Sequence, residues 1–411
     1  MIHKLPKEKL NSGMRELWYM VAFFFLNRIV STSIFEKSNI LDEGFVLISE
    51  ALTIMYFFKW VWCLLKKNRI YLSEISCILS VVAYFILMIS ITFVKDGNIR
   101  RIFMTAYPIV GTLCFLDVES KTHGKELLTG LYYFFTIMLI YNLIDMIFVR
   151  NALSVTVVEF LIGSRDQLGI FLAISISIIG AFYEDNKDMM NFISKLFNVM
   201  LHLLILLTAT LSGSATTLVV LLVMYVLYIS FILKVKSHIL NPTFIIFVYI
   251  VSWLSLIVFR LQYLASDLIV NVLHKDITLS HRTILWDEAL RLIKIKPFFG
   301  YGMSDSVDVF TVDHDYTGGN NNVLSTLSSH NEILQIMYYG GIALVISFLI
   351  LYFVCCSSRR RHNSKFMLFF YAVIGILLVW LSEVPSEYAM FFALGLCYYS
   401  KELDGGMLYN G

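Results

Sequence analysis

The stretch RTILWDEALRLIKIKPFFGYG, residues 282–302, lies in the one polar interval that is long enough to hold a site, residues 261–329. This interval ends at SSHNE, residues 328–332, where the next hydrophobic segment begins. On both sides the chain is a succession of mainly apolar segments of about 17 to 25 residues, long enough to cross a hydrocarbon core of about 30 Å. The sequence therefore predicts a membrane-embedded helical frame that carries one large polar loop.

The composition excludes a soluble protein. Of the 411 residues, 58% are hydrophobic and 15% are charged, whereas a soluble domain is about half apolar and about a quarter charged. The net charge of +2 says little about partners, because the sidedness of charge matters more than its sum in a membrane protein. The predicted fold class is an all-α, polytopic integral membrane protein.

Twelve segments are candidate spans, and the large loop lies between the ninth and the tenth. The last two are short and are predicted to form a tight hairpin or a partly re-entrant element. Three parts follow: an N-terminal transmembrane bundle over 1–260, the extracytoplasmic loop over 261–329, and C-terminal spans with a short cytoplasmic tail over 330–411. The candidate spans are residues 16–33, 44–65, 70–94, 102–118, 127–149, 166–183, 192–211, 215–233, 242–260, 330–354, 366–382 and 385–400.

The connections rich in Lys and Arg predict the orientation. KKNR at 66–69, ESKTHGKE at 119–126 and RRRHNSK at 359–365 are such connections, and they alternate with the others along the chain. Basic connections mark the cytoplasmic side of a membrane. Both termini are therefore predicted to be cytoplasmic, and the 261–329 loop is predicted to lie outside.

Arginine departs from this rule in the predicted topology. We count 14 lysines inside and 5 outside, but only 5 arginines inside and 8 outside. Guanidinium is a rigid fork that binds phosphate oxygens two at a time, so the asymmetry predicts an anionic phosphate ligand at the outer leaflet. The alternative for any single arginine is a snorkelling side chain or a local ion pair. The outer arginines are Arg28, Arg100, Arg101, Arg150, Arg165, Arg260, Arg282 and Arg291.

Residues 281–296 are predicted to form an amphipathic helix. Ser280 is positioned to cap it and Pro297 to stop it. Arg282 and Trp286 stand four residues apart, a spacing that allows stacking. GYG at 300–302 predicts a flexible turn. The structural alternative is a helix that merely lies on the bilayer.

His330 is predicted to be the first residue of the next helix. In SHNE, residues 329–332, Ser329 would be the N-cap and Glu332 the third helical residue of a capping box. The positive end of the helix dipole disfavours imidazolium, so a neutral His330 could accept a proton or a hydrogen bond. The alternative is a polar anchor at the interface.

Taken in order, these motifs resemble the O-antigen ligase and Wzy-type polymerase superfamily. The resemblance implies joining of undecaprenyl-diphosphate-linked glycans at the outer face of the bacterial plasma membrane, without a cofactor or metal. Partners expected from it are the lipid-linked oligosaccharide, membrane lipid, a chain-length regulator and a flippase, with no nucleic acid. The residues that carry the resemblance are Arg282, Trp286, Ala289, Leu292, Pro297, Gly300, Gly302, His330, Asn331, Gly340 and Gly341.

The resemblance also implies site residues. Many relatives have an arginine between the seventh and eighth spans, where this chain has LSGSATTL at 211–218; Arg165 or Arg260 could supply that phosphate contact. No metal-binding motif or P-loop is present in the sequence. The predicted catalytic residues are His330 and Arg282, and the predicted contacts to diphosphate or glycan are Arg165, Arg260, Arg291, Trp286 and Asn331.

Three functions remain open at this stage. A polymerase would join repeat units, and a ligase would move a finished glycan to another acceptor by the same chemistry. A flippase or other transporter would also have many spans, but such proteins usually place their site at mid-membrane between repeated halves, and the chain shows no internal repeat.

Overall fold

The computed structural model describes residues 7–27, 39–67, 69–149, 159–165, 167–235, 241–267, 271, 282–306, 309–313, 324–356, 363–385 and 387–404. Most of these residues are helical, which confirms the predicted fold class. The principal helices are α1 (Lys7–Leu26), α2 (Asn39–Leu65), α3 (Leu72–Val94), α4 (Ile99–Ile144), α5 (Leu168–Asn186), α6 (Phe192–Ser212), α7 (Ala215–Ile232), α8 (Pro242–Trp253) with its continuation η3 (Leu254–Val258), α9 (Arg282–Ile295), α10 (Glu332–Cys355), α11 (Ser364–Trp380) and α12 (Tyr388–Tyr398).

Seven of the described helices are long and apolar enough to cross a membrane. One of them, α4, contains two of the predicted spans, because the chain stays helical through the predicted connection at 119–126 and only kinks at His123. The shorter α8, α11 and α12 are apolar as well. Each predicted span thus overlaps a helix, and α9 corresponds to the predicted loop helix.

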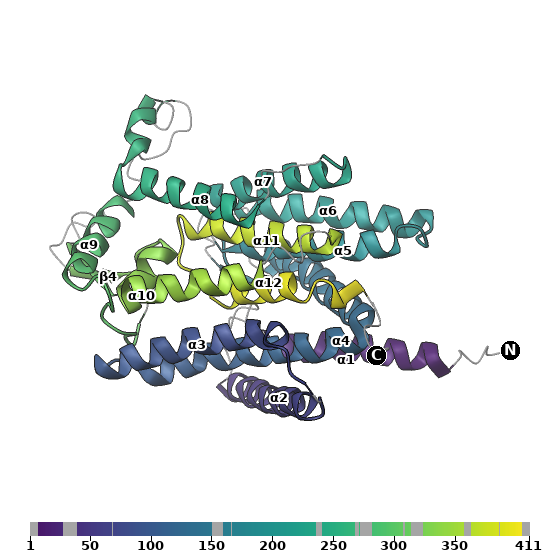
Figure 1. The fold of residues 1–411 in the computed structure, drawn as a ribbon. Coiled ribbons are helices and arrows are strands. Elements are labelled where there is room, and N and C mark those ends of the chain that lie inside the picture. Colours follow the sequence, from purple (N-terminus) through teal and green to yellow (C-terminus); the bar gives the residue numbers. More distant parts are fainter. Residues whose placement is uncertain are drawn as a thin grey trace.

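The helices form one elongated bundle with distinct ends (Figure 1). At one end lie α9 and two short antiparallel hairpins, β1 (Glu159–Phe160) with β2 (Gly163–Ser164) and β3 (Phe310–Asp313) with β4 (Leu324–Leu327). We call this the loop end. The start of α1, the kink of α4 and the short helix η8 (Glu402–Asp404) lie at the opposite end: Arg15 contacts Glu126, and Gly124 packs against the Glu402 backbone.

α11 and α12 form a buried hairpin in the centre of the bundle. α11 packs against α5, α7 and α12, and every residue of α12 is buried. After α12 the chain is back at the end where α11 starts, since Asn363 donates to the Ser400 carbonyl and Lys365 donates to the Leu403 carbonyl. This is the tight hairpin expected for the last two spans. Its tip, residues 381–385 and 387, lies at the loop end.

α10 is broken at Gly341, where φ is +61° and ψ is −159°. The backbone of the segment after α9 forms hydrogen bonds with the groups freed at this break. Tyr301 and Gly302 donate their N–H groups to the carbonyls of Tyr338 and Tyr339, at 2.8 and 2.9 Å. In return, Ile342 and Ala343 donate to the carbonyls of Pro297 and Phe298. A helix broken in a membrane protein must satisfy its freed backbone groups internally, and this exchange does so.

The GYG segment is therefore not the flexible turn predicted from its glycines. Gly300 and Gly302 adopt φ of +56° and +80°. A Cβ added at Gly300 would lie 2.4 Å from the Tyr338 carbonyl oxygen. The glycines are needed because two backbones touch, and the loop is held rigidly against α10.

The orientation of the bundle can be tested with inserted reporters. We expect a reporter that is active only outside the cytoplasm to be active after Asp305, at the loop end, and silent after Lys187, in the α5–α6 connection at the opposite end. Enzyme activity of each fusion in intact cells measures this, and a fluorescent protein that folds only in the cytoplasm should give the reverse pattern. Activity of the external reporter at Lys187 alone would invert the topology.

Candidate functional site

Three segments that are far apart in sequence meet at the loop end. Arg282 is the first residue of α9, His330 lies just before α10, and Glu383 lies in the tip of the α11–α12 hairpin. The Glu383 carboxylate binds both of the others: Oε1 accepts from Nη2 of Arg282, and Oε2 lies 3.2 Å from Nδ1 of His330. The structure thus brings the two predicted catalytic residues together through a carboxylate that the sequence analysis did not select.

This cluster combines a buried anion with two partly accessible groups. The side chain of Glu383 is 7% exposed, that of Arg282 18% and that of His330 34%. A buried carboxylate requires charged or hydrogen-bonding partners, and Glu383 has both. When Nδ1 of His330 donates to Glu383, Nε2 is left as the acceptor nitrogen, and Arg282 retains donors on its remaining nitrogens.

The capping box predicted at 329–332 is wrong in its register. Asn331, not Ser329, is the N-cap of α10: its side-chain oxygen accepts from the Leu334 N–H at 3.0 Å, and the helix begins at Glu332. His330 precedes the helix with a φ of +46°, a region that few residues other than glycine occupy. Such strain is concentrated at functional positions, and here it turns the imidazole toward Glu383.

The side chain of Asn331 connects three segments around the site. Besides capping α10, its side chain accepts from Nε1 of Trp253 and donates to the Leu381 carbonyl, both at 3.0 Å. It is fully buried. Asn331 therefore ties α8, α10 and the α11–α12 tip together, which positions His330 and Glu383.

The predicted partner of Trp286 is wrong. Arg282 points to Glu383, and it is Arg260 whose guanidinium lies over the Trp286 ring, 5.1 Å from its centroid. Arg260 also donates to the Thr283 carbonyl and to Asp287. Trp286 is 1% exposed, and it is part of the apolar face of α9. That face packs against protein, on Ile257, Phe310 and Leu334.

Arg165 lies beside the segment LSGSATTL, residues 211–218, where the resemblance led us to expect an arginine. Its carbonyl accepts from Oγ1 of Thr217 at 3.2 Å, within LSGSATTL. The adjacent Thr216 is 3.5 Å from Oγ of Ser382, the residue before Glu383. The β1–β2 turn before Arg165 is anchored to the end of α4, since Leu161 donates its N–H to Asp145. Arg165 thus belongs to the same end of the bundle as the cluster.

Arg291 is not part of this cluster. It forms a two-pronged contact to Glu288 along the exposed side of α9, at 2.7 Å for each nitrogen, and its side chain is 61% exposed. Arg28, Arg150 and Ser280 lie outside the described residues.

A second acidic pair lies next to the cluster, two and four residues further along the same two segments. Glu332 and Glu387 are 2% and 9% exposed, and one oxygen of each has no hydrogen-bond partner in the part of the chain that the structure describes. The loop end therefore holds three carboxyl groups in a poorly solvated setting.

Among the described residues, no three His, Cys, Asp or Glu side chains are grouped closely enough to hold a metal ion. Among the described side chains, those of Arg282 and His330 contact the Glu383 carboxylate.

Comparison with known proteins finds a family match for the part of the chain that carries Arg282 and His330. Residues 200–349 match the O-antigen ligase family model. The match includes Arg260, Arg282 and His330 and confirms the resemblance drawn from their motifs. It supports a glycan-processing membrane enzyme of the ligase or polymerase type. No curated protein matches the chain.

Glu383 lies outside the matched residues. A sequence signal for it does exist, because it is an ionisable residue between two short apolar spans, and such residues need a partner. What the sequence does not contain is the partner, since Arg282 and His330 are 101 and 53 residues away.

Proposed function

We propose that the protein is a polymerase that joins undecaprenyl-diphosphate-linked oligosaccharide repeat units at the outer face of the bacterial plasma membrane. The observation that supports this most is the carboxylate of Glu383 shared by Arg282 and His330, within and beside the region that matches the O-antigen ligase family. The arrangement unites a proton acceptor and an anion-binding cation, the two groups that glycosyl transfer from a lipid diphosphate needs.

In the proposed reaction a hydroxyl of the acceptor glycan attacks the anomeric carbon of the donor. The new bond joins the hydroxyl oxygen to that carbon while the bond from the carbon to the phosphate oxygen breaks. The hydroxyl proton passes to Nε2 of His330, and the bonding electron pair leaves with the diphosphate. Glu383 holds the imidazole in the tautomer that leaves Nε2 free, as a carboxylate does for a histidine base.

Arginines stabilise the departing diphosphate in this proposal. Arg282 shares the Glu383 carboxylate with His330, and Arg165 and Arg260 lie at the same end of the bundle. Fixed cations in a poorly solvated site stabilise developing negative charge without reorganising. Arg291 would act only as a peripheral contact, because its side chain is 61% exposed and contacts Glu288 and not the cluster.

A ligase that transfers a finished glycan is the second candidate, since ligase is the activity named by the matched family. The two share the transfer step and differ in the acceptor. Only a polymerase extends its own product, so product length separates them.

The decisive experiment is reconstitution. Purified protein in detergent, given undecaprenyl-diphosphate repeat units, should build a ladder of longer glycans, visible by gel electrophoresis and mass spectrometry. A ligase should build no ladder, and with another acceptor added it should transfer single repeat units only; a flippase would leave the repeat units unchanged. His330→Ala should lower the rate by about 10²–10⁴-fold, the usual contribution of a positioned base.

The same assay tests the role of arginine. Arg282→Lys should recover little of the activity lost in Arg282→Ala, because an ammonium group cannot bind phosphate at two points. Ladder formation should also survive EDTA. Loss of the ladder with chelator and its return with Mg²⁺ would show that a divalent ion, not arginine, neutralises the diphosphate.

A further inference from the structure

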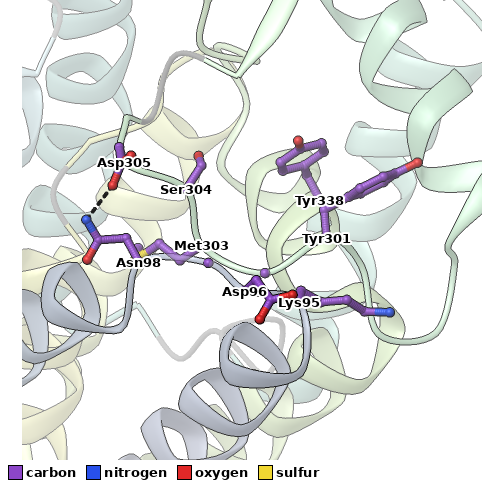
Figure 2. Close-up of a pocket in the computed structure, with 10 residues that line it drawn as sticks. Lys95, Asp96, Asn98, Tyr301, Met303, Ser304, Asp305 and Tyr338 are labelled. Carbon is purple, nitrogen blue, oxygen red and sulfur yellow. Dashed lines mark hydrogen bonds between the residues drawn. The ribbon is translucent and has the colours of Figure 1, made fainter.

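A polymerase has two lipid-linked substrates, and the cluster accounts only for their reacting ends. A separate polar cavity of about 380 Å³ lies at the loop end, between the α3–α4 turn, the segment after α9 and α10. Figure 2 shows its lining: Tyr301 and Tyr338 on one side, Asn98 and Asp305 on the other, with Asp96 and Lys95 from the α3–α4 turn. Its size falls within the range of small-molecule sites, about 300–1,000 Å³.

The cavity is built from rigid parts. Asn98 donates its N–H to the Met303 carbonyl at 2.8 Å, and Met303 donates to Oγ1 of Thr92 at 2.9 Å. Arg101 donates to the Ser304 carbonyl at 2.9 Å. Gly97 allows this approach, because a Cβ there would lie 2.5 Å from the Met303 carbonyl oxygen. A site whose walls are held in this way is organised before a ligand arrives.

The lining has the chemistry of a saccharide site. Asp96 and Asp305 are exposed carboxylates that can accept hydrogen bonds from sugar hydroxyls. Asn98 adds an amide, which already donates to Asp305 at 2.5 Å. Tyr301 and Tyr338 stack with their rings 4.9 Å apart, and an aromatic surface suits the apolar face of a sugar ring. Two carboxylates make the cavity a poor site for a phosphate.

The cavity and the cluster both lie beside α10. Tyr338 stands six residues after the start of α10, so it lies about 9 Å along the helix axis from Glu332 and a little further from His330. A glycan of a few sugars could therefore reach from the cavity to His330.

The surface on the other side of the cavity suits the lipid part of the same molecule. Arg100 is exposed, and in the described part of the chain no ion pair holds it. One helical turn further along α4 begins an apolar groove of about 310 Å³ between α2, α3 and α4, lined by residues that include Phe57, Phe85 and Phe103. Polar groups, a cation and an apolar groove thus follow one another from the α3–α4 turn along α4, which is the order of parts in a lipid diphosphate glycan.

We propose that this face binds the acceptor, resting on the polymerase function proposed above: its sugars lie in the cavity, its diphosphate at Arg100 and its isoprenoid tail in the α2–α4 groove. The non-reducing sugar then points along α10 to His330. The donor and the acceptor would therefore approach His330 from different sides.

The test uses acceptors that cannot donate. One is the repeat-unit oligosaccharide with a simple alkyl aglycone. The other carries undecaprenyl diphosphate through a methylene group in place of the anomeric oxygen. Asp96→Asn with Asp305→Asn should weaken equilibrium binding of both by about tenfold and raise their KM equally, as expected when hydrogen bonds to a ligand are lost. The KM for donor should not change, and Asp188→Asn, an exposed aspartate at the opposite end, serves as the matched control.

Arg100→Gln tests the proposed diphosphate contact separately from the sugar contacts. It should raise the KM only for the acceptor that carries the diphosphate and leave the alkyl glycoside unaffected. Unchanged binding of the alkyl glycoside by the double aspartate variant, or no binding by the wild type, would overturn the proposal. Normal acceptor binding without any glycan product would instead count against the polymerase function.

Discussion

Glu383→Gln is expected to lower the turnover number of ladder formation by about 10²–10⁴-fold while leaving the KM for both substrates nearly unchanged. The amide keeps the size of the side chain and can still contact one partner. It cannot accept from Arg282 and His330 as an anion, so the imidazole loses the partner that fixes its tautomer. Steady-state kinetics with purified protein measures this effect.

A double-mutant cycle makes the assignment sharper. Because Glu383 is proposed to act through His330, adding Glu383→Gln to His330→Ala should cost little beyond the single change, as for residues that work as one unit. Additive losses would mean that Glu383 acts elsewhere. Glu184→Gln, which removes an exposed pair with Lys187 at the opposite end, should be neutral in both backgrounds.

Glu383→Ala would be less informative alone. Removing one member of a buried charge pair costs about 3–5 kcal/mol in typical cases, and the Arg282 guanidinium would be left behind. Thermal unfolding in detergent should therefore show a lower midpoint for Glu383→Ala than for Glu383→Gln. Equal midpoints would indicate that water already screens this ion pair.

Hydrophobic patterning predicted most of the fold. Span length alone located the helices, because a chain in lipid must satisfy its backbone within each segment. Composition predicted a connection at ESKTHGKE, residues 119–126. In the structure α4 remains helical through this segment, and the only break in it is a kink at His123. The β3–β4 hairpin was also missed, because the polar loop has no clear alternation.

The sequence analysis selected Arg282 and His330, which the structure brings together, but it did not predict their contacts. The spacing of Arg282 and Trp286 on one helix predicted a stack that does not form, because Arg282 pairs with Glu383 and the guanidinium of Arg260 lies over the Trp286 ring. The N-cap of α10 was predicted at the wrong residue for a similar reason. Ser329 and Asn331 are both good capping residues, and Asn331 is selected by its contacts to Trp253 and Leu381, which local sequence does not reveal.

Gly341→Ala is expected to have the largest effect on folding of any single methyl group added at the loop end. At this residue φ is +61° and ψ is −159°, a region that is essentially reserved for glycine. The added Cβ would also lie 2.3 Å from the carbonyl carbon of Phe298. The backbone exchange between α10 and the GYG segment would have to separate, and its hydrogen bonds would be lost inside the bundle.

Gly213→Ala provides the matched control. Gly213 also has a positive φ, +64°, but a Cβ there would meet nothing within 4 Å. It should cost about 1–2 kcal/mol, the penalty of the left-handed conformation alone, whereas Gly341→Ala should cost more than about 3 kcal/mol. Monodisperse yield and the thermal midpoint in detergent measure the difference. Equal losses in the two variants would mean that the contact between α10 and the GYG segment adds nothing to stability, and that the motif glycines serve only their own turns.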